Sequence, residues 1–208
     1  FRDEQVTVGQ GAWALPGTLS RPTVAGPVPA VVLVQGSGPS DRDETVGANK
    51  PFRDLAWGLA SRGIAVLRYD KRTLVYGSAM ANSTALTVQD ETIDDALAAV
   101  NLLRHIPGID GRRIVVLGHS LGGMLVPRIG QQDPNIAGFI VMAGATRPLQ
   151  DMMLEQVAYI DSVHGDTSPA ARARLEQLRE QVARVDALTP ATASSSGTLL
   201  GAPASYWL

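Results

Sequence analysis

Short apolar runs alternate with helical patterns over the first two thirds of the chain. Apolar runs of about four to eight residues, each followed by a glycine-rich or charged turn, are typical of buried strands. Such runs occur at residues 30–34, 64–69, 114–117 and 136–143. Before them, alternating polar and apolar positions predict an antiparallel hairpin formed by residues 4–8 and 12–20. Pro16 and Gly17 are expected to weaken the second strand of this hairpin or to place a bulge in it.

Helical patterns separate the later strands. Residues 51–62 begin with a proline and carry apolar side chains on one face, and residues 88–105 repeat apolar positions at helical spacing after an acidic first turn. Residues 75–87 are polar and are expected to be irregular, whereas residues 124–132 predict a third helix. Strands and helices that alternate in this way form a mostly parallel α/β sheet with helices on both faces and a site at the carboxyl ends of the strands.

The pattern changes after residue 147. Residues 149–164 and 169–185 predict two helices, and no further strand is evident before a serine-rich stretch. A helical cap inserted above the sheet would have this pattern. The expected domains are therefore a core at residues 1–147, a helical cap or insertion at 148–200, and the start of a return to the core at 201–208.

The apolar run at residues 114–117 leads directly into the pentapeptide Gly118-His119-Ser120-Leu121-Gly122. A strand, Gly-x-Ser-x-Gly and a helix in this order form a nucleophile elbow, a tight turn that holds the serine in strained backbone geometry. Gly118 and Gly122 are needed because a Cβ atom at either position would strike the neighbouring strand or helix. The turn places the Ser120 hydroxyl at the positive end of the following helix, where the N–H of Leu121 can stabilise an oxyanion.

The strand at residues 30–34 ends in a second informative turn, Gln35-Gly36-Ser37-Gly38-Pro39. A serine hydrolase with a nucleophile elbow takes its second oxyanion donor from the loop after the third strand. We assign this role to the N–H of Ser37, with Gly36 allowing close approach of the substrate. Without the elbow, the same residues would indicate an ordinary strand-to-loop turn.

The composition narrows the classes of function. Hydrophobic residues make up 45% of the chain and charged residues 18%, and the net charge is −2, so no basic surface for nucleic acid is expected. No apolar run approaches the roughly 20 residues of a membrane span. The absence of cysteine excludes thiol catalysis, disulfides and thiolate metal sites. Neither a cofactor nor a metal is indicated.

Two charged clusters follow predicted strands. Residues 40–44 hold three carboxylates and one arginine, and we expect a self-paired, solvated or loop-fixing set rather than a metal site. Asp70 follows the strand at residues 64–69 and precedes Ser120 in the chain, so it is expected to form a structural ion pair with Arg72 rather than to act as the catalytic acid.

Four segments together resemble a known family: residues 35–44, 49–56, 68–73 and 118–123. They are similar to α/β-hydrolases of the bacterial esterase group related to serine aminopeptidases, and the resemblance extends over roughly residues 12–147. It implies hydrolysis of carboxylic esters by a Ser-His-Asp triad, with Ser120 as the nucleophile and a helical cap over the pocket. Gln35 stands where many members of the fold have a histidine, a difference that need not disturb a backbone donor.

The same resemblance implies an acid and a histidine after the nucleophile, on loops that follow two further strands. The chain offers no such pair: His105 precedes Ser120, the side chain of His119 is expected to point away from the serine hydroxyl, and His164 lies in the expected cap. We therefore expect about 80 to 120 further residues, cut off, disordered or on a companion chain, to carry them. Without the two strands, residues 136–143 would present an uncovered apolar edge.

The leading functional hypothesis is a serine hydrolase that acts on small-molecule carboxylic esters through an acyl-enzyme on Ser120. A peptidase or amidase of the same fold is the close alternative, because both use the same intermediate and differ in the pocket. A truncated, non-catalytic hydrolase that binds a ligand or partner is the alternative from another class, and the absence of the Asp and His favours it.

Overall fold

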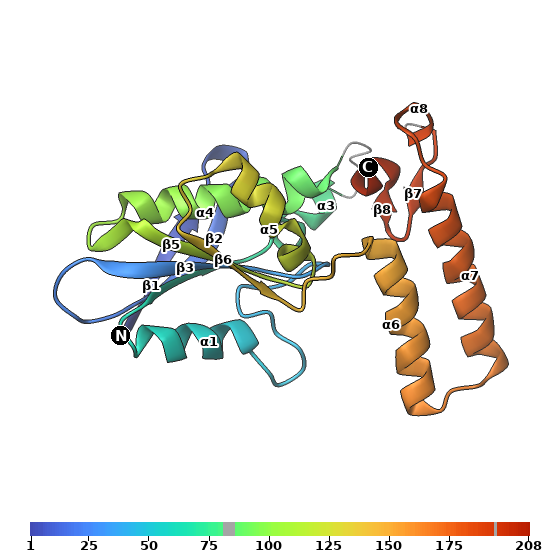
Figure 1. Cartoon of the computed structure of the whole chain (residues 1–208), viewed down its shortest axis with the longest axis horizontal. Coiled ribbons are helices and arrows are strands. Elements are labelled where there is room, and N and C mark those ends of the chain that lie inside the picture. The colour runs from blue at the N-terminus through green and yellow to red at the C-terminus, as the bar shows by residue number, and fades with distance from the viewer. Residues whose placement is uncertain (81–85, 194) are drawn as a thin grey trace. The chain divides into compact units, whose positions relative to one another are not determined.

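The computed structural model describes residues 1–80, 86–193 and 195–208. These residues belong to two compact units (Figure 1). Of the described residues, 1–80 and 89–144 form the first unit, and 86–88, 145–193 and 195–208 form the second.

A six-stranded sheet forms the centre of the first unit. Its strands are β1 (Arg2–Val8), β2 (Leu15–Arg21), β3 (Val28–Val34), β4 (Ala65–Tyr69), β5 (Ile109–His119) and β6 (Gly138–Met142). Their order across the sheet is β1-β2-β4-β3-β5-β6. The first two strands run antiparallel, whereas β4, β3, β5 and β6 are parallel to one another. The mostly parallel α/β sheet predicted from the sequence is confirmed.

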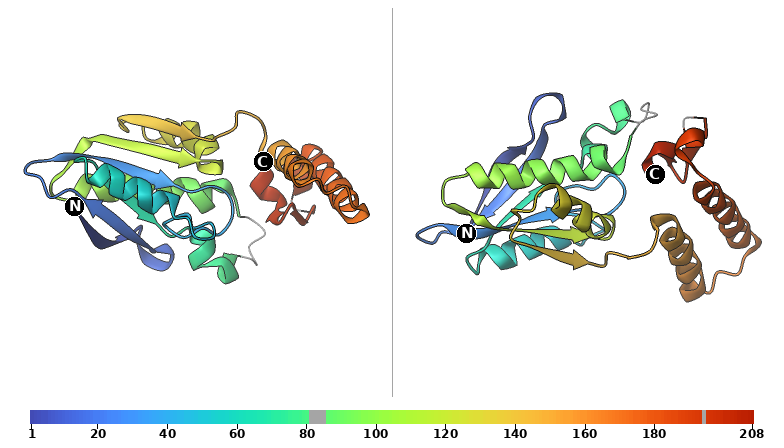
Figure 2. Two further views of the ribbon diagram at one scale, coloured as in Figure 1. Left: turned by 90° about the horizontal axis from the view of Figure 1, so that it is seen from below. Right: turned by 45° about the horizontal axis from the view of Figure 1, so that its top comes forward.

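Helices cover both faces of this sheet. α1 (Pro51–Ala60) lies on one face, and α4 (Asp94–His105) and α5 (Leu121–Gln132) lie on the other (Figure 2). Under α1, Phe52 and Ala56 pack against buried side chains of β3, β4 and β5, namely Val31, Leu33, Val66 and Leu117. Burial on both faces explains why the parallel strands read as continuous apolar runs.

Pro16 and Gly17 do not interrupt β2. Thr7 pairs with Pro16 and Val6 with Gly17 in an unbroken register with β1, so the expected break or bulge is wrong. The pairing of β2 with β4 begins only at Gly17. Pro16 therefore lies just beyond that ladder, where a residue without an N–H group is tolerated.

The segment between β4 and α4 contains more helix than its polar sequence indicates. α2 (Arg72–Val75) and α3 (Gly77–Met80) are short helices, anchored by the buried side chain of Met80 and by a hydrogen bond from Tyr76 Oη to the carbonyl oxygen of Ala14. Residues 81–85 of the expected irregular segment lie outside the described residues. The helix predicted at residues 88–105 begins with a π-helical turn, η2 (Gln89–Ile93).

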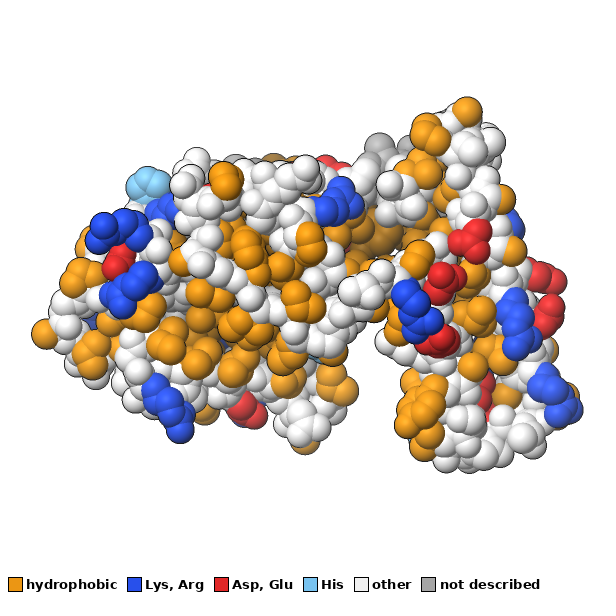
Figure 3. All heavy atoms as spheres, viewed as in Figure 1, with side chains coloured by type: hydrophobic (Ala, Val, Ile, Leu, Met, Phe, Trp, Pro, Cys, Tyr) orange, Lys and Arg blue, Asp and Glu red, His pale blue; other side chains and the backbone are white. Residues whose placement is uncertain are grey.

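The edge strand β6 carries exposed apolar side chains. Phe139, Ile140 and Val141 are 41%, 46% and 54% exposed, and within the described part of the chain β6 pairs only with β5. Figure 3 shows hydrophobic side chains gathered over this side of the first unit. An apolar edge strand of this kind is a surface that folded proteins normally cover.

A helical pair dominates the second unit. α6 (Leu149–His164) ends at Gly165, whose φ is 66°, and α7 (Pro169–Asp186) begins after Ser168, whose hydroxyl accepts a hydrogen bond from Ala171 N. Both helices were predicted. The remaining elements of this unit are α8 (Pro190–Ala193), β7 (Thr198–Leu199), β8 (Ala202–Pro203) and η3 (Ala204–Trp207).

The helices found in the described ranges include none that is both long enough and apolar enough to span a membrane.

Candidate active site

Ser120 occupies a strained turn between β5 and α5. Its backbone angles are φ 50° and ψ −115°, a region that residues with a side chain rarely adopt. Hydrogen bonds hold the turn on both sides: Ser120 N donates to Met142 O at 2.9 Å, and Met124 N donates to Ser120 O at 3.0 Å. The local sequence therefore folds as the strand, elbow and helix expected of a nucleophile turn.

Two glycines allow this turn to pack. A Cβ atom on Gly118 would lie 2.3 Å from the carbonyl oxygen of Gly122, inside α5. A Cβ atom on Gly122 would lie 2.5 Å from Val34 O and 2.7 Å from Gln35 O, at the end of β3. Only glycine fits either position, since contacts this short do not occur between real atoms.

The loop after β3 meets the elbow. Val34 pairs with Gly118, so Gly36 and Ser120 each lie two residues beyond the same register position. A Cβ atom on Gly36 would come within 3.2 Å of Cβ of Ser120. The fold thus brings together Gly36, its neighbour Ser37, and the first residue of α5, Leu121. The N–H of Leu121 belongs to the first turn of a helix and has no intrahelical acceptor.

A single carboxylate joins the loop to the elbow. Glu44 Oε1 accepts a hydrogen bond from Gly36 N at 2.8 Å and lies 2.8 Å from His119 Nδ1. Glu44 is buried and has a positive φ of 51°. Its second carboxylate oxygen, Oε2, is buried and makes no hydrogen bond within the described structure. The Nδ1 atom of His119 is therefore occupied by its contact with Glu44.

The opposite side of the loop contacts Tyr69, the last residue of β4, and Lys71, two residues beyond it. Gln35 Nε2 donates to the carbonyl oxygen of Tyr69, and Lys71 Nζ donates to the carbonyl oxygen of Gly36 at 2.6 Å. The side chain of Lys71 is 2% exposed and lies 3.2 Å from Glu91 Oε1. The loop after β3 is thus held by the side chain of Gln35 and by the N–H and carbonyl groups of Gly36.

Burial shifts the pKa values of three side chains in this region. Burial lowers the pKa of the Lys71 ammonium, an effect that the nearby Glu91 carboxylate opposes. Burial also raises the pKa of Asp95 to about 6, although the ion pair with Arg72 favours the charged form. The phenol of Tyr69 is fully buried, and its pKa is raised well above the usual value.

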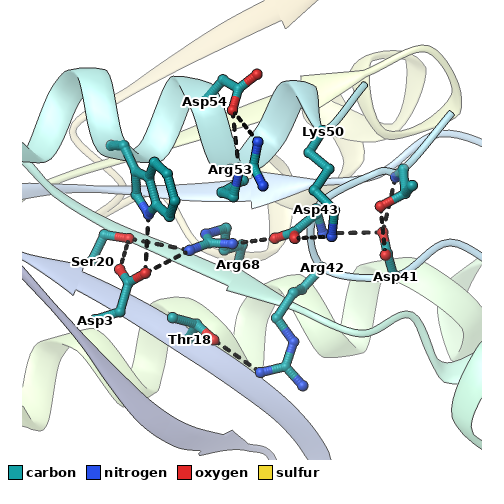
Figure 4. A network of polar contacts seen from close by, with 12 residues as sticks. Asp3, Thr18, Ser20, Asp41, Arg42, Asp43, Lys50, Arg53, Asp54 and Arg68 are labelled. Atoms are coloured by element: carbon teal, nitrogen blue, oxygen red, sulfur yellow. Dashed lines mark hydrogen bonds and ion pairs between the residues drawn. The ribbon is translucent and has the colours of Figure 1, made fainter. Parts of the chain in front are cut away.

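The charged loop between β3 and α1 is fixed from its base (Figure 4). Asp43 lies 3.0 Å from Lys50 Nζ and contacts the buried guanidinium of Arg68, which in turn lies 3.3 Å from Asp3. Asp41 accepts hydrogen bonds from Thr45, within the loop itself. The loop-fixing role predicted for this acidic cluster is confirmed. In the described residues, no group of three His, Cys, Asp or Glu side chains could hold a metal ion.

Asp70 pairs with a different arginine from the one expected. Arg42 Nη2 lies 2.7 Å from Asp70 Oδ2, and Arg42 Nε donates to Asp70 Oδ1 at 2.9 Å. The expected pair with Arg72 is wrong, because α2 begins at Arg72 and its guanidinium binds Asp95 of α4. Asp70 still has the structural role expected of it, in fixing the charged loop.

The described histidines have polar partners other than Ser120 or lie in the other unit. His105 Nδ1 contacts Asn101 O at 2.8 Å at the exposed end of α4, His119 contacts Glu44, and His164 lies in the last turn of α6. Across the described ranges, no hydrogen bond joins any histidine to Ser120 Oγ. The residues that sequence analysis missed are Glu44 and Lys71. The sequence indicated only that each of them lies in a charged cluster after a predicted parallel strand.

The comparisons with known proteins agree with this geometry. The alpha/beta hydrolase family matches residues 14–208. Esterase EstD from Thermotoga maritima is 46% identical over 163 residues, which cover 78% of this chain and 37% of the esterase. The chain therefore spans little more than a third of the length of that relative.

Two solved structures share the fold. The 2,6-dihydroxy-pseudo-oxynicotine hydrolase has a TM-score of 0.57 at 23% identity, over 86% of this chain and 46% of that one. An acylaminoacyl peptidase has a TM-score of 0.55 at 21% identity, over 74% of this chain and 25% of that one. Because the family matches residues 14–208, nearly the whole of this chain, the chain belongs to the α/β-hydrolase family.

Proposed function

We propose that the protein is a serine hydrolase of small carboxylic esters, in which Ser120 forms the acyl-enzyme. The observation that carries the proposal is the strained turn at Ser120, packed against the loop of Gly36. A half-buried serine on such a turn, beside backbone N–H groups, is the arrangement that acyl transfer requires. The 46% identity to a protein named as an esterase supports esters as the substrate class.

In this proposal the Ser120 oxygen attacks the carbonyl carbon of the ester and loses its proton to a general base. The negative charge that develops on the carbonyl oxygen is held by the N–H groups of Ser37 and Leu121. The alcohol then leaves, and water hydrolyses the acyl-enzyme. Because the two histidines of the first unit, His105 and His119, are bonded to Asn101 O and Glu44 rather than to Ser120, and because the chain spans 37% of the matched esterase, we place the base and its acid on a further segment or a companion chain.

The helical pair α6 and α7 has the proposed role of a cap, with residues 1–147 as the catalytic core. Caps of this kind define the acyl and alcohol pockets, so they decide which substrate is accepted. The exposed face of β6 is, in the same proposal, the surface against which the remaining strands pack.

The test compares two substrate classes on the intact protein. We expect hydrolysis of p-nitrophenyl acetate and butyrate with a kcat/KM at least about a hundredfold above that for aminoacyl p-nitroanilides. Ser120→Ala removes both activities, whereas Ser61→Ala, which replaces an exposed serine at the end of α1, retains them. A preference for the anilides would assign a peptidase instead. Equal, background rates for wild type and Ser120→Ala would favour the non-catalytic binding protein.

A further inference from the structure

The peptide group between Gly36 and Ser37 carries a contact that the catalytic proposal does not use. Its carbonyl oxygen belongs to Gly36 and accepts the 2.6 Å hydrogen bond from Lys71 Nζ. Its N–H belongs to Ser37, the assigned oxyanion donor. The two ends of a planar peptide group are coupled by resonance. A cation at the oxygen therefore draws electron density from the nitrogen and makes the Ser37 N–H a stronger donor.

The same contact also fixes the direction of that N–H. The C=O and N–H of a trans peptide point in opposite directions, so holding the Gly36 oxygen on Lys71 aims the Ser37 N–H to the other side. The preceding peptide is held independently, because Gly36 N donates to Glu44 Oε1 at 2.8 Å. With both neighbouring peptide planes anchored, the loop has little freedom to turn the donor away.

Desolvation disfavours the charged ammonium of Lys71 in this position. Its side chain is 2% exposed, and a buried charge destabilises the folded state unless partners compensate for it. Glu91 lies 3.2 Å away, and Glu44 adds a second nearby negative charge. A buried charge so arranged, with one of its hydrogen bonds directed at the oxyanion loop, is suited to preorganising a site rather than to stability alone.

We propose that Lys71 is a positioning residue of the oxyanion hole, which orients and polarises the Ser37 N–H through the Gly36 carbonyl. The proposal rests on the proposed function, since it requires that Ser37 stabilises an oxyanion. Lys71 does not touch the substrate. Its removal should therefore weaken binding of the transition state and leave binding of the ground-state ester unchanged.

The experiment uses Lys71→Met in the intact protein, with Arg72→Met as the matched control. Arg72 is the adjacent cation, and its guanidinium pairs with the buried Asp95 and stacks over Trp13. We expect kcat for a p-nitrophenyl ester to fall about tenfold in Lys71→Met with KM unchanged, and the Ki of a trifluoromethyl ketone, which forms an oxyanion on the serine, to rise about tenfold. Arg72→Met should retain the wild-type kcat and Ki.

A second variant and a second measurement keep the test decisive. Lys71→Gln retains an uncharged donor and should lie between wild type and Lys71→Met in kcat. The amide nitrogen resonance of Ser37 reports the contact without turnover. We expect it to move upfield in Lys71→Met and to stay in place in Arg72→Met, because the hydrogen bond to the Gly36 carbonyl is lost only in the first.

The outcomes separate the two proposals. Ester hydrolysis no faster in wild type than in Ser120→Ala would reject the proposed function, and the Ser37 resonance would then decide the role of Lys71 by itself. A folded Lys71→Met with wild-type kcat and Ki, or an unmoved Ser37 resonance, would overturn the positioning role. Unfolding of both Lys71 variants alongside a folded Arg72→Met would assign Lys71 to stability and overturn it as well.

Discussion

At the scale of single residues, the site depends on positions where only glycine fits. Gly118 and Gly122 let β5, α5 and β3 meet with backbone against backbone, and the turn they permit gives Ser120 its φ of 50°. The energy of such a turn is small compared with the packing that imposes it, because strained residues persist only where their surroundings over-determine them.

Replacing Gly118 with alanine should therefore destabilise the fold. A Cβ atom 2.3 Å from Gly122 O forces β5 and α5 apart, and we expect the free energy of unfolding to fall by about 3 kcal/mol or more. Gly58→Ala is the matched control. Gly58 lies inside α1 with only the end of the Arg62 side chain nearby, so this change should raise stability by up to about 1 kcal/mol. Urea unfolding of both variants measures the difference. Equal effects would contradict the packing described for the elbow.

Asp95 predicts a pH dependence of stability. Burial raises its pKa to about 6 in the folded protein, against the usual 3.8 in the unfolded chain. Between these pH values the folded state keeps a proton that the unfolded state has lost. The contribution of Asp95 to stability is therefore full below pH 3.8 and is lost as the pH rises through 6.

Asp95→Asn removes that titration. The free energy of unfolding of the variant should rise more steeply with pH than that of wild type between pH 4.5 and 6.5, by at most about 1.4 kcal/mol per pH unit, the value for one proton. Urea unfolding at a series of pH values measures the slopes, with the exposed Asp54→Asn as the control. Identical slopes for wild type and Asp95→Asn would show that the carboxyl group titrates normally in the fold.

At the scale of elements, what the sequence predicted well was local. The parallel strands, the elbow and the helix after it are determined by apolar runs and glycines within about 20 contiguous residues, and all of them form as expected. The proximity of Ser120 and Gly36 could also be predicted, because neighbouring parallel strands end at one edge of a sheet.

What the sequence did not predict depends on partners distant along the chain. Asp70 pairs with Arg42, 28 residues before it, and not with the nearby Arg72. Glu44 joins Gly36 to His119, 75 residues further on. Lys71 reaches the Gly36 carbonyl across 35 residues. Charge patterns show that such residues are at the right edge of the sheet, but tertiary packing decides which of them meet.

The charged loop between β3 and α1 allows a test of one such distant contact. Asp43→Asn removes the nearest anionic partner of Arg68, whose side chain is 4% exposed and keeps the longer contacts to Asp3 and Ser20. Breaking a buried pair in this way should cost about 3 kcal/mol of stability. Asp54→Asn makes the same chemical change in an exposed pair with Arg53 and should cost under about 0.5 kcal/mol. Thermal unfolding of both variants distinguishes them, and a cost for Asp43→Asn as small as that of its control would show that Arg68 is satisfied without it.

At the scale of the whole molecule, the chain combines a unit built on a six-stranded sheet with a helical unit. The sheet order, β1-β2-β4-β3-β5-β6, ends in the exposed apolar side chains of β6, and the chain covers 37% of an esterase that is 46% identical to it. The proposed division of labour follows from these facts. In the function we propose, the first unit supplies the nucleophile and the oxyanion donors, the helical pair acts as a cap, and a further segment or a companion chain supplies the general base.

The most direct test of the central claim is the site of reaction with a fluorophosphonate in the intact protein. Such a probe forms a covalent bond only with a serine whose hydroxyl is activated and whose oxyanion is stabilised. Peptide mapping by mass spectrometry should find one adduct, on Ser120, and none in Ser120→Ala. An unmodified Ser120 in a protein that hydrolyses esters, or an adduct on a different residue, would contradict the account.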